Sequence, residues 1–265
     1  MKITQVSNPH GLLGLNYVRV IANIEESGRK RGYMEHLDQT YYVFDLDNTL
    51  YRSDSGFFDQ QMALMNEFIQ QTLQVDHDEA AFIRDDYYHR FGTTLHGLMY
   101  YHDVDPQAYF DHVNQVSLDH LSMDPALLFT LNRLREEGKQ TYVWTNASRG
   151  HTKRVMKHLG FNRLFDGVVT LECTGFLPKP SPKFYDHALA ANGIDPMKAV
   201  FFEDSSHNLA AAKEYGMQTV LIQADDTAHA RFVVHPEIDF LVKDIVSFFQ
   251  GNYIDSRAAS LNRFM

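Results

Sequence analysis

Two aspartates, Asp45 and Asp47, stand at the end of the apolar segment 41–46. Residues two apart on a strand point to the same side, so the two carboxylates would project together. Adjacent carboxylates repel each other unless a cation or a shared proton compensates them. The pair therefore indicates a site for a cation or for proton transfer. The alternative is a strand that runs into a turn stabilised by aspartate side chains.

Two further segments carry groups that could bind an anion. Thr145 and Asn146 follow an apolar run that ends at Trp144. A hydroxyl and an amide there can donate to a phosphate oxygen, although short polar residues also form ordinary turns and helix N-caps. Lys179 lies between two prolines, which stiffen the backbone around this one cation. An isolated lysine is usually a solvated surface group, so this segment indicates an anion site only in combination with the other polar segments.

Glu203 and Asp204 repeat the acidic pattern after the apolar segment 199–202. Asp204 could complete a hard-cation site with Asp45, with Glu203 as a ligand or as support for one. The alternative is an acidic N-cap of the following helix, which accounts for one carboxylate more readily than for two.

Each of these polar segments follows a short apolar run, and the runs alternate with stretches of helical period. None of the runs alternates with polar residues as a half-exposed strand would, so we expect buried parallel strands. The predicted fold class is α/β, with a doubly wound, Rossmann-like parallel sheet. Such a sheet binds ligands beyond the carboxyl ends of its strands, where these polar residues stand. The expected strands are residues 41–46, 141–144, 167–170, 199–202 and 218–222.

The interval between the first and second expected strands is much longer than the ~30 residues of a βαβ unit. Inside it, Phe58, Met62, Met65 and Ile69 recur at helical spacing, which predicts an amphipathic helix. We therefore expect a helical cap inserted after the first strand. The expected divisions are an N-terminal extension at 1–40, a core at 41–54 and 125–250, a cap at 55–124 and a loosely held tail at 251–265.

The composition is that of a globular protein of 265 residues with 44% hydrophobic residues and a net charge of −10. That charge disfavours nucleic acid and anionic membranes as partners. The sequence contains no apolar run long enough to predict a membrane-spanning helix. Its one cysteine, Cys173, is compatible with a reducing compartment, and we expect a cytoplasmic protein. Met34 follows a segment whose codons could form a ribosome-binding site, so it is an alternative start to Met1.

In their order, the four polar segments resemble the four motifs of the haloacid dehalogenase-like hydrolase superfamily, over residues 41–222. The resemblance implies a sheet order of five, four, one, two, three for the expected strands, which brings the acidic pairs together. It also implies that Asp45 is a nucleophile that forms an aspartyl-phosphate. Asp47 would protonate the leaving oxygen and then deprotonate water.

The same resemblance implies a Mg²⁺ ion held by Asp45, by the backbone carbonyl of Asp47 and by Asp204. Asn208 stands where many family members have another acidic residue, so the outer shell of this site would be one charge weaker. The transferring phosphoryl group would be bound by Thr145, Asn146 and Lys179.

Within the expected cap, residues 88–98 resemble the corresponding segment of pyrimidine 5′-nucleotidases. This implies a phosphomonoesterase whose partner is a small phosphorylated metabolite, a nucleoside monophosphate such as UMP or CMP. The tyrosines, histidines and Arg90 of segment 87–101 could stack on a base, or they could form the cap's own core. A phosphoglycolate or sugar-phosphate phosphatase and a phosphomutase are the alternatives. A dehalogenase has no need of Asp47 as an acid, and the presence of all four motifs argues against a non-enzymatic phosphate-binding protein.

Overall fold

The computed structural model describes residues 39–223 and 236–255. Within them, seven strands form one sheet in the order β3-β2-β1-β4-β5-β6-β7. Neighbouring strands are parallel except for β6 and β7, which are antiparallel. The predicted fold class is confirmed, and β1 lies between β2 and β4 as the family resemblance implied. The strands are β1 (Tyr41–Phe44), β2 (Gln140–Trp144), β3 (Gly167–Val169), β4 (Ala199–Glu203), β5 (Gln218–Ile222), β6 (Phe240–Val242) and β7 (Ile254–Asp255).

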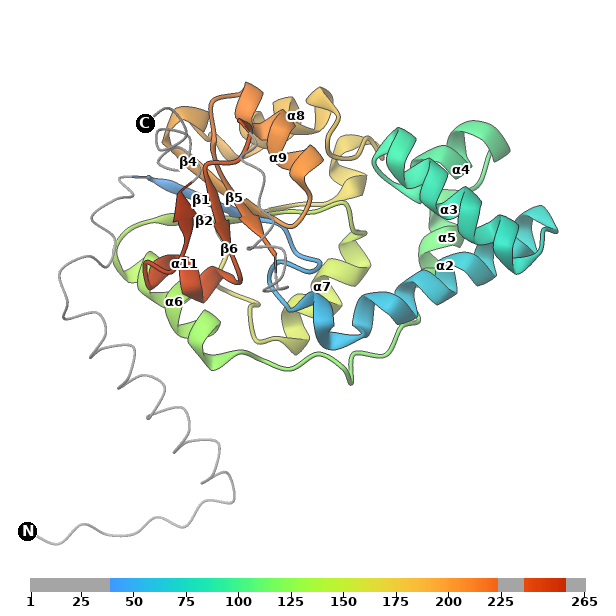
Figure 1. Ribbon diagram of the computed structural model, residues 1–265, viewed down its shortest axis with the longest axis horizontal. Helices are drawn as coiled ribbons and strands as arrows, with labels where there is room; N and C mark the ends of the chain where they lie inside the picture. Colours follow the sequence, from blue (N-terminus) through green and yellow to red (C-terminus); the bar gives the residue numbers. More distant parts are fainter. Residues whose placement is uncertain (1–38, 224–235, 256–265) are drawn as a thin grey trace, which may run out of the picture.

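Helices cover both faces of the sheet (Figure 1). On one face, α6 (Pro125–Glu136), α7 (Arg149–His158) and α11 (Ile245–Phe249) contribute to a shared hydrophobic cluster. On the other face, α8 (Pro182–Asn192) and α9 (Ser206–Glu214) do the same. The central strands are therefore buried on both sides, which is why their sequences are continuous apolar runs.

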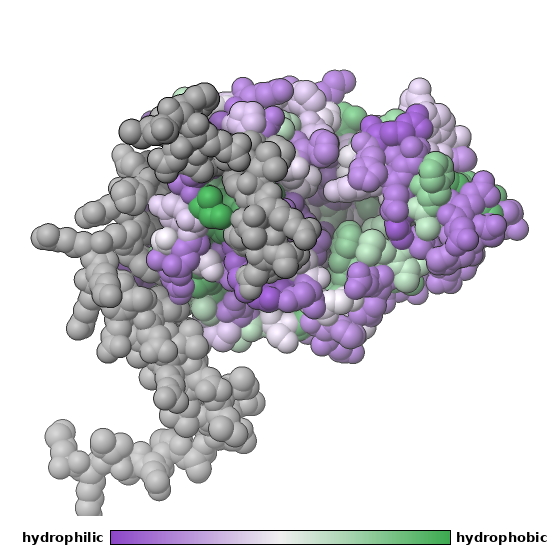
Figure 2. Space-filling model, in the orientation of Figure 1, coloured by the Kyte–Doolittle hydropathy of each residue, from purple (hydrophilic) through white to green (hydrophobic). Residues whose placement is uncertain are grey.

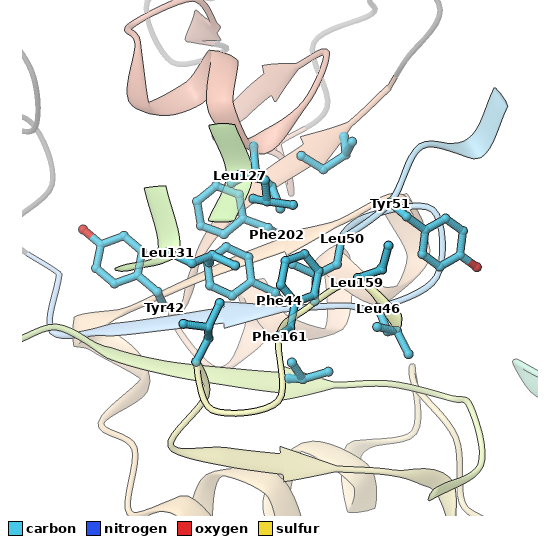
Figure 3. Packing of buried hydrophobic residues seen from close by; sticks show 14 of the residues in the cluster. Tyr42, Phe44, Leu46, Leu50, Tyr51, Leu127, Leu131, Leu159, Phe161 and Phe202 are labelled. Atoms are coloured by element: carbon cyan, nitrogen blue, oxygen red, sulfur yellow. The ribbon is translucent and has the colours of Figure 1, made fainter. Parts of the chain in front are cut away.

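Aromatic side chains from neighbouring strands form the centre of the core (Figure 3). Phe44 of β1 and Phe202 of β4 are fully buried, and their rings stack with centroids 4.9 Å apart. Leu127 and Leu131 of α6 belong to the same cluster. The Tyr51 ring belongs to the same cluster. The Tyr51 hydroxyl points away from the other labelled side chains (Figure 3). A residue anchored in the core therefore reaches toward the edge of the sheet where ligands bind.

The cap consists of α2 (Phe57–Leu73), α3 (His77–Phe91), α4 (Thr94–His102) and α5 (Pro106–Val113). These helices stand beside the sheet at one end of the molecule (Figure 1), between β1 and α6 in the chain. The predicted helical cap is confirmed. It has its own hydrophobic cluster, which includes Ile69. The face of the cap turned to the viewer in Figure 2 is largely hydrophilic.

The apolar stripe predicted on α2 divides between two environments. Ile69 is buried inside the cap. Phe58, Met62 and Met65 are only half-buried, and they line a cavity between the cap and the core. The periodicity predicted the helix correctly, but only part of its apolar face is used for packing. Phe58 and Met62 face the cavity, and Met65 lines it while also packing against the cap's cluster.

The two strands β6 and β7 lie outside the predicted set. β7 pairs antiparallel with β6, and the Tyr253 ring packs on Phe240 with centroids 4.9 Å apart. The expectation of a loosely held tail beginning at residue 251 is therefore wrong for Tyr253 and for Ile254–Asp255. The physical reason is that β6 offers an open sheet edge to the backbone of β7, and the side chains of Tyr253 and Ile254 find apolar partners there.

Residues 256–265 and most of the expected N-terminal extension lie outside the described residues. The alternative start at Met34 falls in this part of the chain. Within 39–223 and 236–255, no helix combines the length and the apolar character that crossing a membrane requires.

Gly97 of α4 tests the packing between α3 and α4. A Cβ placed on Gly97 would lie 2.3 Å from the Tyr87 ring. Glycine to alanine inside a helix ordinarily stabilises a protein by about 0.5–1 kcal/mol. Here the overpacking reverses the sign, and we expect Gly97→Ala to lower the free energy of unfolding by ~1–3 kcal/mol in urea denaturation.

Gly150 of α7 supplies the matched control, because a Cβ there meets nothing within 4 Å. Gly150→Ala should leave stability unchanged or raise it slightly. Equal effects of the two substitutions would contradict the close contact between α3 and α4.

Candidate active site

A cavity of about 560 Å³ lies between the carboxyl ends of the central strands and the cap. β2 and β4 flank β1, so polar residues that follow these strands meet at one edge of the sheet. The cap helices α2, α3 and α5 contribute the opposite wall. The residues singled out in the sequence all line this cavity: Asp45, Asp47, Thr145, Asn146, Lys179, Glu203 and Asp204.

Lys179 joins the acidic groups that follow β1 and β4. Its Nζ donates hydrogen bonds to Asp45 Oδ1 at 2.7 Å, to Glu203 Oε2 at 2.7 Å and to the Trp144 carbonyl at 2.8 Å. Burial alone would lower the pKa of Lys179, but the charges of Asp45 and Glu203 raise it, so the amine stays protonated. The protein itself engages all three ammonium protons. The lysine is thus in place beside Asp45 before any ligand arrives.

Glu203 is surrounded by hydrogen-bond donors. Its Oε1 accepts the backbone N–H groups of Asp204 and Ser205, each at 3.1 Å. Its Oε2 accepts from Lys179 at 2.7 Å and from Asn208 Nδ2 at 3.1 Å. These four bonds use the lone pairs that a metal ion would need. The sequence left two roles open for Glu203, and these contacts favour support of the metal ligands over metal ligation. The bond from Asn208 is one that an ionised acid at position 208 could not donate.

Asp45, Glu203 and Asp204 form a concentrated acidic cluster, with one oxygen from each lying within 4.8 Å of the others. Burial, followed by the charge of Glu203, raises the pKa of Asp45 well above its ordinary value. Asp204 is exposed to the cavity, and its limited hydration there, followed by the charges of Glu203 and Asp45, raises its pKa in the same way. Lys179 balances only part of this charge. An excess of carboxylate oxygens suits a hard divalent cation, so the donor set fits the Mg²⁺ that the family resemblance implied.

Asp47 has a different environment from Asp45. Its Oδ1 accepts a hydrogen bond from Tyr51 at 2.8 Å and lies 3.1 Å from His151 Nε2. Burial alone would raise the pKa of Asp47, but the neighbouring His151 and the Tyr51 hydroxyl lower it. The two aspartates of one motif are therefore held by separate sets of partners, as two different chemical roles would require.

Thr145 and Asn146 differ in how much of their polar capacity is free. Thr145 Oγ1 accepts the Ala147 N–H at 3.0 Å, so its own proton remains available to a ligand. The Asn146 side chain accepts the Lys179 N–H at 2.8 Å and donates to the Lys179 carbonyl at 3.1 Å. The amide thus fixes the backbone that carries Lys179, and its predicted contact with a phosphoryl oxygen stays a prediction.

The cap touches the loop that carries Lys179 directly at the corner between α3 and α4. Gly92 has φ +82°, and a Cβ on it would lie 2.4 Å from the Lys179 carbonyl oxygen. Only glycine permits this conformation together with so close an approach. His96 Nδ1 lies 3.1 Å from the Phe176 carbonyl, in the same loop. The wall of the cavity is therefore held in place by the loop that carries Lys179.

The aromatic cap segment divides between packing and the cavity. Tyr87 is buried in the cap's own core, whereas Tyr88 is half exposed and lines the cavity together with His89. The Arg90 guanidinium donates hydrogen bonds to Asp86 and to the hydroxyl of Tyr101. The interpretation as packing is confirmed for Tyr87. Stacking on a base stays a prediction, and of the tyrosines, histidines and Arg90 of this segment, Tyr88 and His89 are the ones that line the cavity.

Tyr51 and His151 were not identified in the sequence, although both contact Asp47. His151 lies in the first turn of α7, and its backbone N–H bonds to the N-cap Ser148. A histidine in the first turn of a helix that starts at the binding edge of the sheet was the available signal. Tyr51 gave a weaker one, because a tyrosine four residues after Asp47 looks like an ordinary core residue.

Residues 42–222 match the family model described as haloacid dehalogenase-like hydrolase. The chain belongs to this family. The residues that the resemblance identified as its four motifs are those that meet at the carboxyl ends of β1, β2 and β4. The family match covers all of these residues, and the sheet order brings them to one cavity.

Curated relatives and solved structures extend this comparison. Phosphate metabolism protein 8 of Saccharomyces cerevisiae is 30% identical over 198 residues, which cover 70% of this hydrolase but only 62% of the yeast protein. Glyceraldehyde 3-phosphate phosphatase of Methanocaldococcus jannaschii is 27% identical over 192 residues, covering 68% and 83% of the two chains. CbbY from Rhodobacter sphaeroides, solved in complex with phosphate, has a TM-score of 0.58 at 19% identity and covers 79% of this chain and 96% of its own. At that identity the likeness shows the shared fold.

Removing the buried cation tests whether Lys179 holds the acidic cluster together. Lys179→Met leaves Asp45 and Glu203 facing each other without compensation, and we expect the free energy of unfolding to fall by ~3–5 kcal/mol. The double variant Lys179→Met/Glu203→Gln carries one fewer carboxylate and should recover part of this loss. Guanidinium denaturation of the four proteins, including Glu203→Gln alone, measures the coupling.

Lys198→Met is the control, because the side chain of Lys198 is largely exposed. It should change stability by less than ~0.5 kcal/mol. If the losses in the free energy of unfolding of the two single variants simply add in the double variant, Lys179 and Glu203 do not stabilise each other.

Proposed function

We propose that this hydrolase is a Mg²⁺-dependent phosphomonoesterase that works through an aspartyl-phosphate intermediate. The observation that carries the proposal is the separation of Asp45 and Asp47. Asp45 lies beside Lys179 and the acidic cluster, while Asp47 is held by Tyr51 and His151 in the same cavity. A nucleophile and an acid–base group supplied by one motif are what a two-step phosphoryl transfer needs.

The chain's own residues can be given roles in this reaction. Asp45 Oδ1 is held by Lys179, and no described residue donates to Oδ2, which leaves Oδ2 to attack phosphorus. Thr145 Oγ1 and backbone N–H groups would bind phosphoryl oxygens. Asp47 would give a proton to the leaving oxygen and later take one from water. Asp45, the carbonyl of Asp47 and Asp204 would hold Mg²⁺, which offsets the repulsion between the carboxylate and the phosphate.

A pyrimidine nucleoside monophosphate is the substrate that we propose. The cap wall combines apolar Phe58, Met62 and Met65 with the aromatic Tyr88 and His89. Apolar and aromatic side chains suit the faces of a flat ring, and the polar atoms of Tyr88 and His89 can reach its edge. The volume of about 560 Å³ is in the range of pockets for ligands of this size. The resemblance of the cap segment to pyrimidine 5′-nucleotidases supports the same choice.

A small sugar phosphate is the second candidate. It is favoured by the similarity to a protein named glyceraldehyde 3-phosphate phosphatase, which extends over 68% of this chain. The substrate experiment below includes it as an alternative outcome.

Metal dependence is tested by removing one proposed ligand. Asp204→Ala takes away a carboxylate that is exposed to the cavity and does not contact Lys179, so the fold should persist. We expect the Mg²⁺ concentration that gives half-maximal hydrolysis of p-nitrophenyl phosphate to rise at least ~10-fold. EDTA should abolish the activity of the unaltered protein, and Mg²⁺ should restore it.

Asp45→Asn is the companion variant, because it keeps the shape of the side chain but removes the attacking charge. It should lose activity at every Mg²⁺ concentration. Hydrolysis that survives exhaustive chelation would reject the metal, and an active Asp45→Asn protein would reject the covalent intermediate.

Substrate choice is tested by comparing kcat/KM for UMP, CMP, AMP, GMP and glyceraldehyde 3-phosphate. We expect the pyrimidine nucleotides to be hydrolysed fastest, because a pocket shaped for one ring excludes two. Tyr88→Ala should lower kcat/KM for UMP by ~10-fold or more. Its turnover of p-nitrophenyl phosphate should change little, because the core carries out the chemistry.

Phe82→Ala is the matched control, since Phe82 lies on the same helix but is 70% exposed and outside the cavity. It should leave both rates unchanged. Equal rates on purine and pyrimidine nucleotides would reject the nucleotidase, and a preference for the sugar phosphate would establish the second candidate.

A further inference from the structure

Two side chains from different parts of the chain converge on one oxygen of Asp47. Tyr51, which follows β1, donates its hydroxyl to Oδ1 at 2.8 Å. His151 of α7 places Nε2 at 3.1 Å from the same atom. No described residue donates to Asp47 Oδ2. The carboxyl group is therefore held through one oxygen only, and its second oxygen is free to face a ligand in the cavity.

His151 is placed for this contact by its surroundings. The residue is fully buried, and its backbone N–H bonds to Ser148 Oγ at 3.2 Å. Its ring lies against Phe57, with centroids 5.8 Å apart. Nδ1 is buried without a hydrogen-bond partner in the described part of the chain, so Nε2 makes the polar contact of the ring. A carboxylate only accepts hydrogen bonds, which assigns the N–H to Nε2.

Tyr51 is equally constrained. Its ring belongs to the main core cluster and packs edge-on against Phe57 with centroids 5.4 Å apart. Its hydroxyl leaves that cluster, as Figure 3 shows, and bonds to Asp47. Phe57 thus contacts both donors. The shared contact with Phe57 sets the positions of both side chains. Tyr51 lies outside the lining of the cavity, whereas His151 is part of that lining.

We propose that Tyr51 and His151 are positioning residues that lock Asp47 through Oδ1 and so assign proton transfer to Oδ2. This inference rests on the phosphomonoesterase activity proposed above. As the bond between phosphorus and the leaving oxygen breaks, its electron pair stays on that oxygen, which takes the proton from Oδ2. In the second step, Oδ2 takes a proton from the water that attacks the aspartyl-phosphate, and the carboxylate of Asp45 is released. Asp47 thus loses a proton to the leaving oxygen in the first step and regains one from water in the second.

The arrangement predicts how rates depend on the leaving group. Without the two donors, the Asp47 side chain can rotate, and the fraction of molecules with Oδ2 aimed at the leaving oxygen falls. An alkoxide leaving group needs the proton, since general acid catalysis contributes ~10²–10⁴-fold. A p-nitrophenolate is stable without it. Loss of positioning must therefore slow alkyl phosphates much more than p-nitrophenyl phosphate.

The experiment compares Tyr51→Phe, His151→Leu and His151→Gln on UMP and on a series of aryl phosphates with leaving groups of increasing pKa. We expect Tyr51→Phe and His151→Leu each to lower kcat for UMP by ~10–100-fold and to lower p-nitrophenyl phosphate turnover by less than ~3-fold. The plot of rate against leaving-group pKa should become steeper. His151→Gln keeps an N–H near the position of Nε2 and should recover most of the loss.

A double-mutant cycle separates positioning from a general effect on the fold. In the Asp47→Asn background, His151→Leu should cause no further change in the dependence on the leaving group. His158→Leu is the control on the same helix, because His158 bonds to the Leu121 carbonyl away from the cavity. Its rates should match those of the unaltered protein. Tyr51→Phe removes a single oxygen atom, so it keeps the test decisive if His151→Leu does not fold.

An equal fall for good and poor leaving groups, or a failure of His151→Gln to recover activity, would overturn the positioning role while leaving the phosphomonoesterase intact. An unaltered protein that hydrolyses none of the esters in the presence of Mg²⁺ would overturn both. The two outcomes are distinguished by the activity of the unaltered protein alone.

Discussion

The buried contact of Lys179 with Asp45 and Glu203 is the interaction on which the rest of the site depends. Three carboxylates meet at the ends of β1 and β4, and charges removed from water are costly unless they are paired. Lys179 provides this pairing. The Asn146 side chain fixes the loop that carries it, by bonding to both the N–H and the carbonyl of Lys179. The remaining excess of negative charge is what makes the edge of the sheet receptive to a divalent cation.

Contact between the cap and the core links the cap wall of the cavity to this charged cluster. Gly92 lets the α3–α4 corner lie directly on the Lys179 carbonyl, so the helix that carries Tyr88 and His89 is positioned by the loop that carries the lysine. Movement of the cap away from the core would uncover the cavity and separate these two groups. The core and the cap walls of the cavity therefore share one geometric support.

The two aspartates of the first motif show how one short segment can supply two chemical roles. Asp45 is crowded by other acids, whereas Asp47 is surrounded by donors that lower its pKa. The negative charge of a bound phosphate ester acts in the opposite direction and favours a proton on Asp47. Tyr51 of the main core cluster bonds to Asp47, and Phe57 of the same cluster packs against both Tyr51 and His151.

Local patterns in the sequence predicted strands β1 to β5 and the acidic, hydroxyl and lysine groups that line the cavity, because each of these signals lies within a few neighbouring residues. The long interval between the first two strands predicted the helical insertion. β6 and β7 lie outside the predicted set; β7 has only two residues and is an edge strand, so its sequence carries almost no periodic signal. Only the tertiary structure decided that Tyr51 and His151 meet at one oxygen of Asp47, or that Met62 and Met65 line a cavity. The contact of His151 with Asp47 joins residues far apart in the chain. Tyr51 lies only four residues from Asp47, but the direction of its hydroxyl depends on how its ring packs in the core. Helical periodicity marks an apolar face without saying whether protein or ligand will cover it.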